Sequence, residues 1–149
     1  MANRGIWSLS GVGLTTVLNP GTTLATATMS GASSTYTNNS SLDLYCDVEF
    51  NSGGTFSPST GAYVDIYIWE SVDGTNFPAQ SAADLRLTST QKFCTIPIGT
   101  TATTAQRVVA RNLLLPAGNI QFLLDNQTGA TLPSTWTVKI LPYSYNLNG

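Results

Sequence analysis

Hydrophobic and polar residues alternate along most of this chain with a period of two. In the segment SLDLYCDVEFN, one row is apolar and the other consists of acidic residues and a tyrosine. The apolar row comprises Leu42, Leu44, Cys46, Val48 and Phe50. Successive side chains of a β-strand point to opposite faces of the sheet. The pattern therefore predicts a half-buried strand whose other face is polar.

The segment AYVDIYIWE repeats the alternation with a different second row. Its apolar row is Ala62, Val64, Ile66 and Ile68, which we expect to face the core. The other row carries one acidic residue and three aromatic residues, Tyr63, Tyr67 and Trp69. An aromatic row of this kind is suited to packing, so we expect this face of the strand to be covered as well.

Four later segments and one weaker early segment show the same period between breaks rich in Gly, Pro, Asn or Thr. They are QKFCTIPI, AQRVVARNL, NIQFLLDN, STWTVKILPY and, more weakly, LATATM. Pro97 predicts an edge strand or a bulge, because proline cannot donate to a strand ladder. No segment of about 10 residues or more has helical periodicity. We predict an all-β protein, an antiparallel β-sandwich with jelly-roll topology or, alternatively, immunoglobulin-like topology.

The chain of 149 residues is long enough for one domain with a substantial core. Residues 1–23 hold scattered glycines around isolated apolar residues such as Ile6 and Trp7. We interpret this segment as an irregular N-terminal arm and residues 24–149 as the β-sandwich domain. Two interpretations of the arm stay open: it packs on a neighbouring subunit, or it folds over its own sandwich.

Charged residues make up only 9% of the sequence, whereas hydrophobic residues make up 42%. An average soluble domain carries about 25% charged residues. A surface of neutral hydroxyls and amides loses water at little cost and so suits packing against other protein. The net charge is −2, and the six Lys and Arg residues form no cluster in the sequence, which argues against a nucleic-acid partner. We also expect no membrane association and, without a secretory leader, synthesis in a cytoplasm.

The sequence contains few of the residue combinations that catalytic or metal-binding sites require. The chain has no histidine, which excludes Ser-His-Asp and Cys-His nucleophilic catalysis and leaves too few ligands for a zinc site. A catalytic carboxylate pair is formally possible among four acidic residues that could share one sheet face, Asp43, Asp47, Glu49 and Asp65. Their alternation with apolar residues is, however, typical of a solvated face. We expect no enzyme, no cofactor, no metal and no small-molecule substrate.

Two further features, the turn-like stretch at Asp73 and the pair of cysteines, can each be interpreted in two ways. The stretch Asp73-Gly74-Thr75-Asn76 lacks the alternating ligands of a calcium loop, so we favour a tight turn. Cys46 and Cys94 lie in separate predicted strands, where a disulfide could join them. Two buried thiols are the interpretation we favour for a protein made in the cytoplasm.

The order of several phrases resembles small structural proteins of tailed bacteriophages. The phrases are YVDIYIWESVDGTNFP, then TTAQRVVARNLLLPAGNIQFLLDNQTGATLP, then KILPYSY near the end. They fall between Leu42 and Tyr145, about two thirds of the chain. The resemblance implies a capsid decoration (cement) protein, which sits on the outside of the phage head as a homotrimer and holds neighbouring major capsid subunits together after expansion.

On this hypothesis the protein is part of the virion, and its partner is the major capsid protein. Ile6, Trp7, Tyr63, Tyr67 and Trp69 are our candidate interface residues; ordinary core or edge packing is the alternative for each. Two other functions stay open: another virion component such as a tail or neck protein, and a carbohydrate-binding β-sandwich module that stacks sugar on the aromatic row. For that row we favour packing over sugar binding.

Overall fold

The computed structural model describes residues 6–9, 13–78, 81–88, 91–100 and 104–146. This part of the chain contains ten strands and one short helix. In chain order they are β1 (Ile6–Leu9), β2 (Thr15–Leu18), β3 (Thr28–Met29), β4 (Tyr36–Asn38), β5 (Tyr45–Asn51), β6 (Tyr63–Ser71), α1 (Ala82–Thr88), β7 (Lys92–Pro97), β8 (Arg107–Leu114), β9 (Gly118–Gln127) and β10 (Thr137–Asn146).

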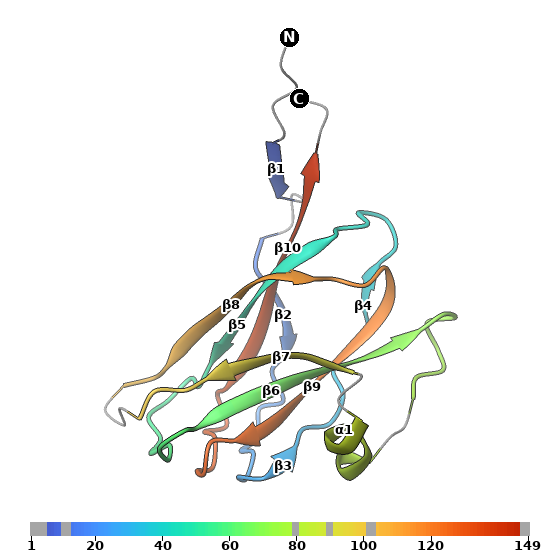
Figure 1. The fold of residues 1–149 in the computed structure, drawn as a ribbon. Coiled ribbons are helices and arrows are strands. Elements are labelled where there is room, and N and C mark those ends of the chain that lie inside the picture. The colour runs from blue at the N-terminus through green and yellow to red at the C-terminus, as the bar shows by residue number, and fades with distance from the viewer. Residues whose placement is uncertain (1–5, 10–12, 79–80, 89–90, 101–103, 147–149) are drawn as a thin grey trace.

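The strands form two antiparallel sheets that pack face to face (Figure 1). Sheet I has the order β1-β10-β5-β8, with β2 also paired to β10. Sheet II has the order β3-β9-β6-β7, with β4 also paired to β9. The prediction of an antiparallel β-sandwich is therefore confirmed.

Four nested antiparallel pairs define the topology. The innermost pair is β6 with β7; outside it lie β5 with β8, β4 with β9, and β2 with β10. The chain thus behaves as one long hairpin whose successive pairs fall alternately in sheet II and sheet I. This wrapping is the jelly-roll arrangement, which decides between the two topologies that the sequence left open.

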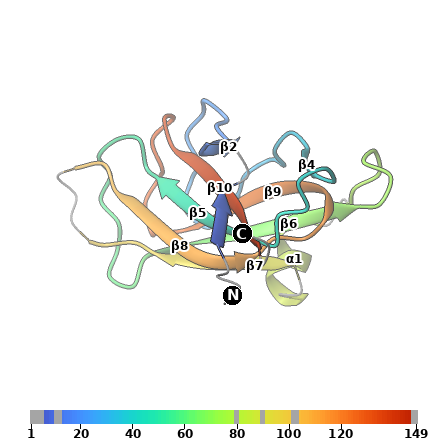
Figure 2. The same ribbon diagram turned by 90° about the horizontal axis from the view of Figure 1, so that it is seen from above.

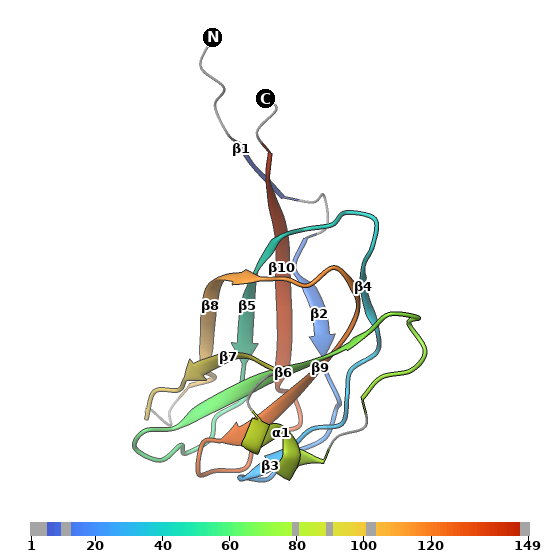
Figure 3. The ribbon, with the colours of Figure 1, turned by 45° about the vertical axis from the view of Figure 1, so that its right-hand side comes forward.

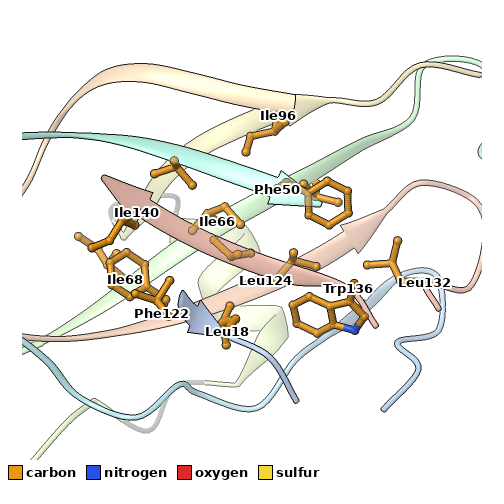
Figure 4. Packing of buried hydrophobic residues seen from close by; sticks show 14 of the residues in the cluster. Leu18, Phe50, Ile66, Ile68, Ile96, Phe122, Leu124, Leu132, Trp136 and Ile140 are labelled. Carbon is orange, nitrogen blue, oxygen red and sulfur yellow. The ribbon is translucent and has the colours of Figure 1, made fainter. Parts of the chain in front are cut away.

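The core is the layer of apolar side chains between the sheets (Figure 4). The residues predicted to face inward on β6, Val64, Ile66 and Ile68, are all buried in it, as is Ala62 just before the strand. The same holds for Cys46, Val48 and Phe50 on β5. Other large members are Phe122, Leu124, Leu132, Trp136 and Ile140.

The prediction that Leu42 and Leu44 face the core is wrong. Strand β5 begins only at Tyr45, and the two leucines precede it with 55% and 56% of their surface exposed. Leu42 has a positive φ of 48°, so the chain bends there and the alternation of an extended strand does not reach this point. Asp43, which the alternation placed on the polar face, is instead buried.

The N-terminal segment contributes strands to sheet I. Within the predicted arm, β2 pairs with β10, and its residues Val17 and Leu18 are buried in the core. Strand β1 pairs with Tyr143–Asn146 at the end of β10, whereas β5 pairs with β10 only as far as Tyr143. Figures 1 and 3 show this two-stranded ribbon, Ile6–Leu9 with Tyr143–Asn146, projecting from the sandwich.

The two cysteines are free in this structure. Cys46 is fully buried on β5, and Cys94 is half-buried on β7. Burial raises the pKa of each thiol to about 12, which keeps both protonated at neutral pH. The favoured interpretation of two thiols is confirmed, with Cys94 less buried than expected.

Trp136 offers a direct test of the core. Its side chain is fully buried, and its indole nitrogen donates to the Thr22 carbonyl oxygen at 3.1 Å, which ties the segment after β2 to the core. We expect Trp136→Ala to lower the free energy of unfolding by about 3–5 kcal/mol, because it leaves a large cavity. Urea denaturation measures this change.

The matched control is Val72→Ala, since Val72 is fully exposed. Its effect should stay within about 0.5 kcal/mol. If Trp136→Ala were as mild as the control, the tryptophan would not be part of the packed layer.

Candidate functional site

The outer faces of the two sheets are the candidate functional surfaces, and they differ in how they are covered. Helix α1 lies on the outer side of sheet II (Figure 2). It buries Leu85 against Tyr67 and Leu123, with Met29 and Trp69 packed around them. The helix was not predicted, because seven residues are too few for helical periodicity to register.

A charged network completes the cover of sheet II. Asp65 on β6 and Asp125 on β9 lie directly opposite each other in register, and both are buried. Like charges opposite each other destabilise a sheet, so each carboxylate needs its own cation. Lys92 Nζ lies 2.6 Å from Asp65 Oδ2, and Arg86 binds both oxygens of Asp125 at 2.5 and 2.8 Å.

Neutral donors satisfy the rest of this network. Thr95 Oγ1 donates to Asp65 at 2.5 Å, and Gln127 Nε2 donates to Asp125 at 3.0 Å. The hydrogen bond to Asp65 raises the pKa of Lys92, and that to Asp125 raises the pKa of Arg86, so both cations stay charged. A hollow of about 280 Å³ lies among these residues, but their charged groups are already paired. We call this outer face of sheet II, with α1 upon it, the closed face.

The structure distributes the predicted interface residues over two separate places. Tyr63, Tyr67 and Trp69 share the closed face, where Tyr67 is only 1% exposed and the other two are half-buried. Ile6 and Trp7 lie on the ribbon of sheet I, opposite Asn146 and Tyr145. Within the single chain, Leu85 of α1 thus packs with Tyr67 and Trp69 of the aromatic row, whereas Tyr63 lines the hollow beside them.

The predicted carboxylate set is also divided. Asp47 and Glu49 lie on sheet I, Asp43 precedes β5, and Asp65 lies on sheet II, where its nearest acidic partner is Asp125. Nothing in the sequence indicated Asp125, because the register of β6 and β9 brings it to Asp65 across 60 positions. Among the described residues, no group of three or more His, Cys, Asp or Glu could hold a metal ion.

The outer face of sheet I has no such cover among the described residues, and we call it the open face. Its centre is a β-bulge, where Val48 pairs with Ala110 and Cys46 with Leu113. Asp47 therefore lies opposite two residues, Arg111 and Asn112. A β-bulge re-aims side chains, which here points polar groups of β8 outward.

Polar contacts hold the bulge in place. Asn112 has a positive φ of 57°, and its backbone N–H donates to Asp47 Oδ1 at 3.0 Å. The Tyr143 hydroxyl donates to Asn112 Oδ1 at 2.7 Å and lies 3.2 Å from Asp47 Oδ1. Burial and the Asp47 carboxylate raise the pKa of Tyr143, so the hydroxyl remains a donor. Tyr45 stacks on Tyr143 with ring centroids 6.1 Å apart.

The stretch Asp73-Gly74-Thr75-Asn76, which follows the end of β6 at Ser71, is a turn, as predicted. Gly74 has a φ of 73°, and the Asp73 carboxylate accepts hydrogen bonds from the backbone N–H groups of Thr75 and Asn76, both at 2.8 Å. Ser71 and the Asn76 side chain donate to the same carboxylate. These hydrogen bonds hold the pKa of Asp73 well below its ordinary value, and the bond from the Asn76 backbone N–H has the largest effect.

Comparisons with known proteins give little further guidance. A scan against protein-family models finds no match, and a search of curated proteins finds none either. A search of solved structures matches the crystal structure of the CBM36-1 domain of a multidomain xylanase from the hindgut metagenome of Trinervitermes trinervoides. That match has 11% sequence identity and a TM-score of 0.44, and it covers 95% of each chain. Similarity at this level does not bear on what the chain binds. No helix in the described residues is long and apolar enough to cross a membrane.

The closed face yields a prediction about stability. In Arg86→Ala, the buried Asp125 loses its cation, which should lower the free energy of unfolding by about 2–3 kcal/mol. The expected loss is smaller than that for a fully buried ion pair, because the arginine side chain is one third exposed. Adding Asp125→Asn should recover part of the loss, since a neutral amide needs no cation. A double-mutant cycle in urea measures both effects.

Arg111→Ala is the control, because its bridge to Asp47 on the open face is long, its side chain is 71% exposed, and Asp47 keeps its hydrogen bonds from Asn112 and Tyr143. That variant should lose less than about 1 kcal/mol. Equal losses for Arg86→Ala and Arg111→Ala would contradict a structural role for the closed-face network.

The turn yields a prediction about pH. Because the pKa of Asp73 is depressed in the folded state, its stabilising effect is present above the unfolded pKa of about 4 and is lost as the pH falls below it. The difference in stability between the wild type and Asp73→Ala should therefore be largest at neutral pH and shrink in acid. Urea denaturation across this range measures it, with Val72→Ala following the wild type throughout. A difference that is constant with pH would contradict the assignment.

Proposed function

We propose that this chain is a structural virion protein, a capsid decoration protein that binds the outer surface of a tailed-phage head and stabilises the expanded shell. The observation that carries the proposal is the projecting ribbon of β1 and the end of β10. A two-stranded ribbon alone is marginally stable in water. Past Tyr143, β1 is the strand that pairs with β10 among the described residues, and the proposal places the capsid partner against this ribbon.

The composition of the ribbon supports assembly with protein. Its two strands, IWSL and YSYN, contain no charged residue, so docking strips no full charge of water. Exposed Leu14, Leu42 and Leu44 add apolar surface to segments that adjoin β2, β5 and β10. The resemblance of the sequence to phage structural proteins implies the class of partner, the major capsid protein. A jelly roll by itself does not, because this architecture carries many functions.

The proposed mechanism is differential binding. A protein that binds the expanded shell and not the unexpanded one stabilises the expanded state in proportion to the difference in affinity. Contacts repeated over a lattice add through multivalency, and a homotrimer, which the proposal includes, would engage several capsid subunits at once. No catalytic step or cofactor is required, and the protein would reside in the virion.

The carbohydrate-binding alternative has weaker support. It needs an exposed aromatic platform, whereas Tyr67 lies beneath Leu85 of α1 in this chain. A glycan array with the isolated protein tests it directly. Sugar binding that quenches tryptophan fluorescence, together with no affinity for capsids, would favour the carbohydrate function over decoration.

Co-sedimentation with expanded phage capsids that lack this protein tests the proposal. We expect saturable binding at a copy number comparable with that of the major capsid protein, and a higher melting temperature of the shell. Binding at a few copies would indicate a tail or neck protein instead, and no binding would refute decoration.

Introducing a charged side chain into the ribbon tests whether the ribbon contacts the capsid. We expect Trp7→Asp to weaken capsid binding by about tenfold or more, because a carboxylate must then be desolvated at the interface. Val72→Asp is the matched control, since it places the same charge at a fully exposed position on the turn after β6. Binding of Trp7→Asp at wild-type affinity would exclude the ribbon as the docking element and leave decoration itself standing.

A further inference from the structure

The charges of the open face lie at two depths. Its acidic side chains, Asp47 and Glu49, are only 17% and 11% exposed. Its arginine side chains, Arg107 and Arg111, are 63% and 71% exposed. Lys139, opposite Glu49 in register, adds a third cation that makes no ion pair with any described residue. Solvent therefore meets a positive surface, although the whole chain has a net charge of −2.

The two arginines keep most of their donors free. Arg107 Nε lies 3.5 Å from Glu49, and Arg111 Nη1 lies 3.4 Å from Asp47, which are long single contacts. A guanidinium has five N–H donors, and exposed pairs of this kind contribute little stability. Both side chains can thus turn toward another carboxylate and bind it with two parallel hydrogen bonds. Arg86 on the closed face is already engaged, since its Nε and Nη2 bind the two oxygens of Asp125 and Nη2 also donates to the Ala27 carbonyl oxygen.

Apolar residues accompany the cations on the same strand. Val109 lies between Arg107 and Arg111 on β8 and is 39% exposed, and Leu114 at the end of β8 is 70% exposed. The bulge held by Asp47, Asn112 and Tyr143 fixes the backbone beneath them. Arginine beside exposed apolar residues on a rigid support is typical of protein interfaces.

We propose that the open face is a docking surface for a protein patch in which carboxylates flank an apolar contact. Charge complementarity selects this occupant, because the exposed groups are cationic and apolar while the acids are recessed. Three cations are too few to displace the counterions of a nucleic acid along a stripe, and Val109 and Leu114 suit protein side chains better than phosphate. The identity of the occupant rests on the proposed function: it is an acidic patch on the outer surface of the major capsid protein.

Ion exchange tests the surface without reference to any function. At pH 7 the wild type should be retained on a carboxymethyl matrix at low salt, despite its negative net charge, and should elute as salt screens the contact. Arg107→Gln with Arg111→Gln should pass through unretained. The control, Val72→Glu with Thr75→Glu, changes the net charge by the same two units on the turn after β6 and should still be retained. Passage of the wild type through the column would overturn the proposal.

Capsid binding then tests the occupant. The double glutamine variant should bind expanded capsids at least about tenfold more weakly than the wild type and lose most of the salt dependence, whereas the control should bind normally. Urea midpoints close to that of the wild type establish that both variants fold.

The failures are distinguishable. If the wild type binds capsids and the glutamine variant binds equally well, the docking surface is wrong and decoration stands. If the wild type is retained on the carboxymethyl matrix but ignores capsids, decoration fails and the acidic-partner surface stands. Tight binding of duplex DNA through the same arginines would overturn the choice of a protein partner.

Discussion

A single layer of apolar side chains between two sheets is the constraint on which the rest of this molecule depends. Alternate residues of β5, β6, β9 and β10 supply the layer, and Trp136 is the largest fully buried member. Because strand side chains alternate, every residue that enters the layer places its neighbours on one of the two outer faces. The packing of the core therefore determines which polar side chains lie on each outer face.

The two outer faces resolve their charges in opposite ways. On the closed face, Asp65 and Asp125 are buried directly opposite each other, and two like charges so placed repel unless each has a close cation, so Lys92 and Arg86 are held in structural ion pairs. On the open face the acids are recessed while the cations reach solvent through weak contacts. One face thereby stabilises the fold, and the other retains groups that can interact with a second molecule.

Much of the fold could be predicted because the alternation is strong where strands are long. It placed the inward row of β6 correctly and the buried part of β5 from Cys46 onward. It failed at Leu42 and Leu44, because alternation extends beyond the strand in the sequence but not in the structure, where the chain bends at Leu42. It also missed α1, whose position depends on one buried leucine and one ion pair rather than on a periodic face.

The sequence by itself determined an all-β sandwich, its inward rows, the turn at Asp73 and an unusually neutral surface, since each follows from local pattern or composition. The tertiary structure alone decided the jelly-roll pairing, the meeting of Asp65 with Asp125, and the gathering of Arg107, Arg111 and Lys139 on one face. The physical reason is register. Pairing between strands distant in the chain brings these residues together, and no local pattern encodes which strand will lie beside which.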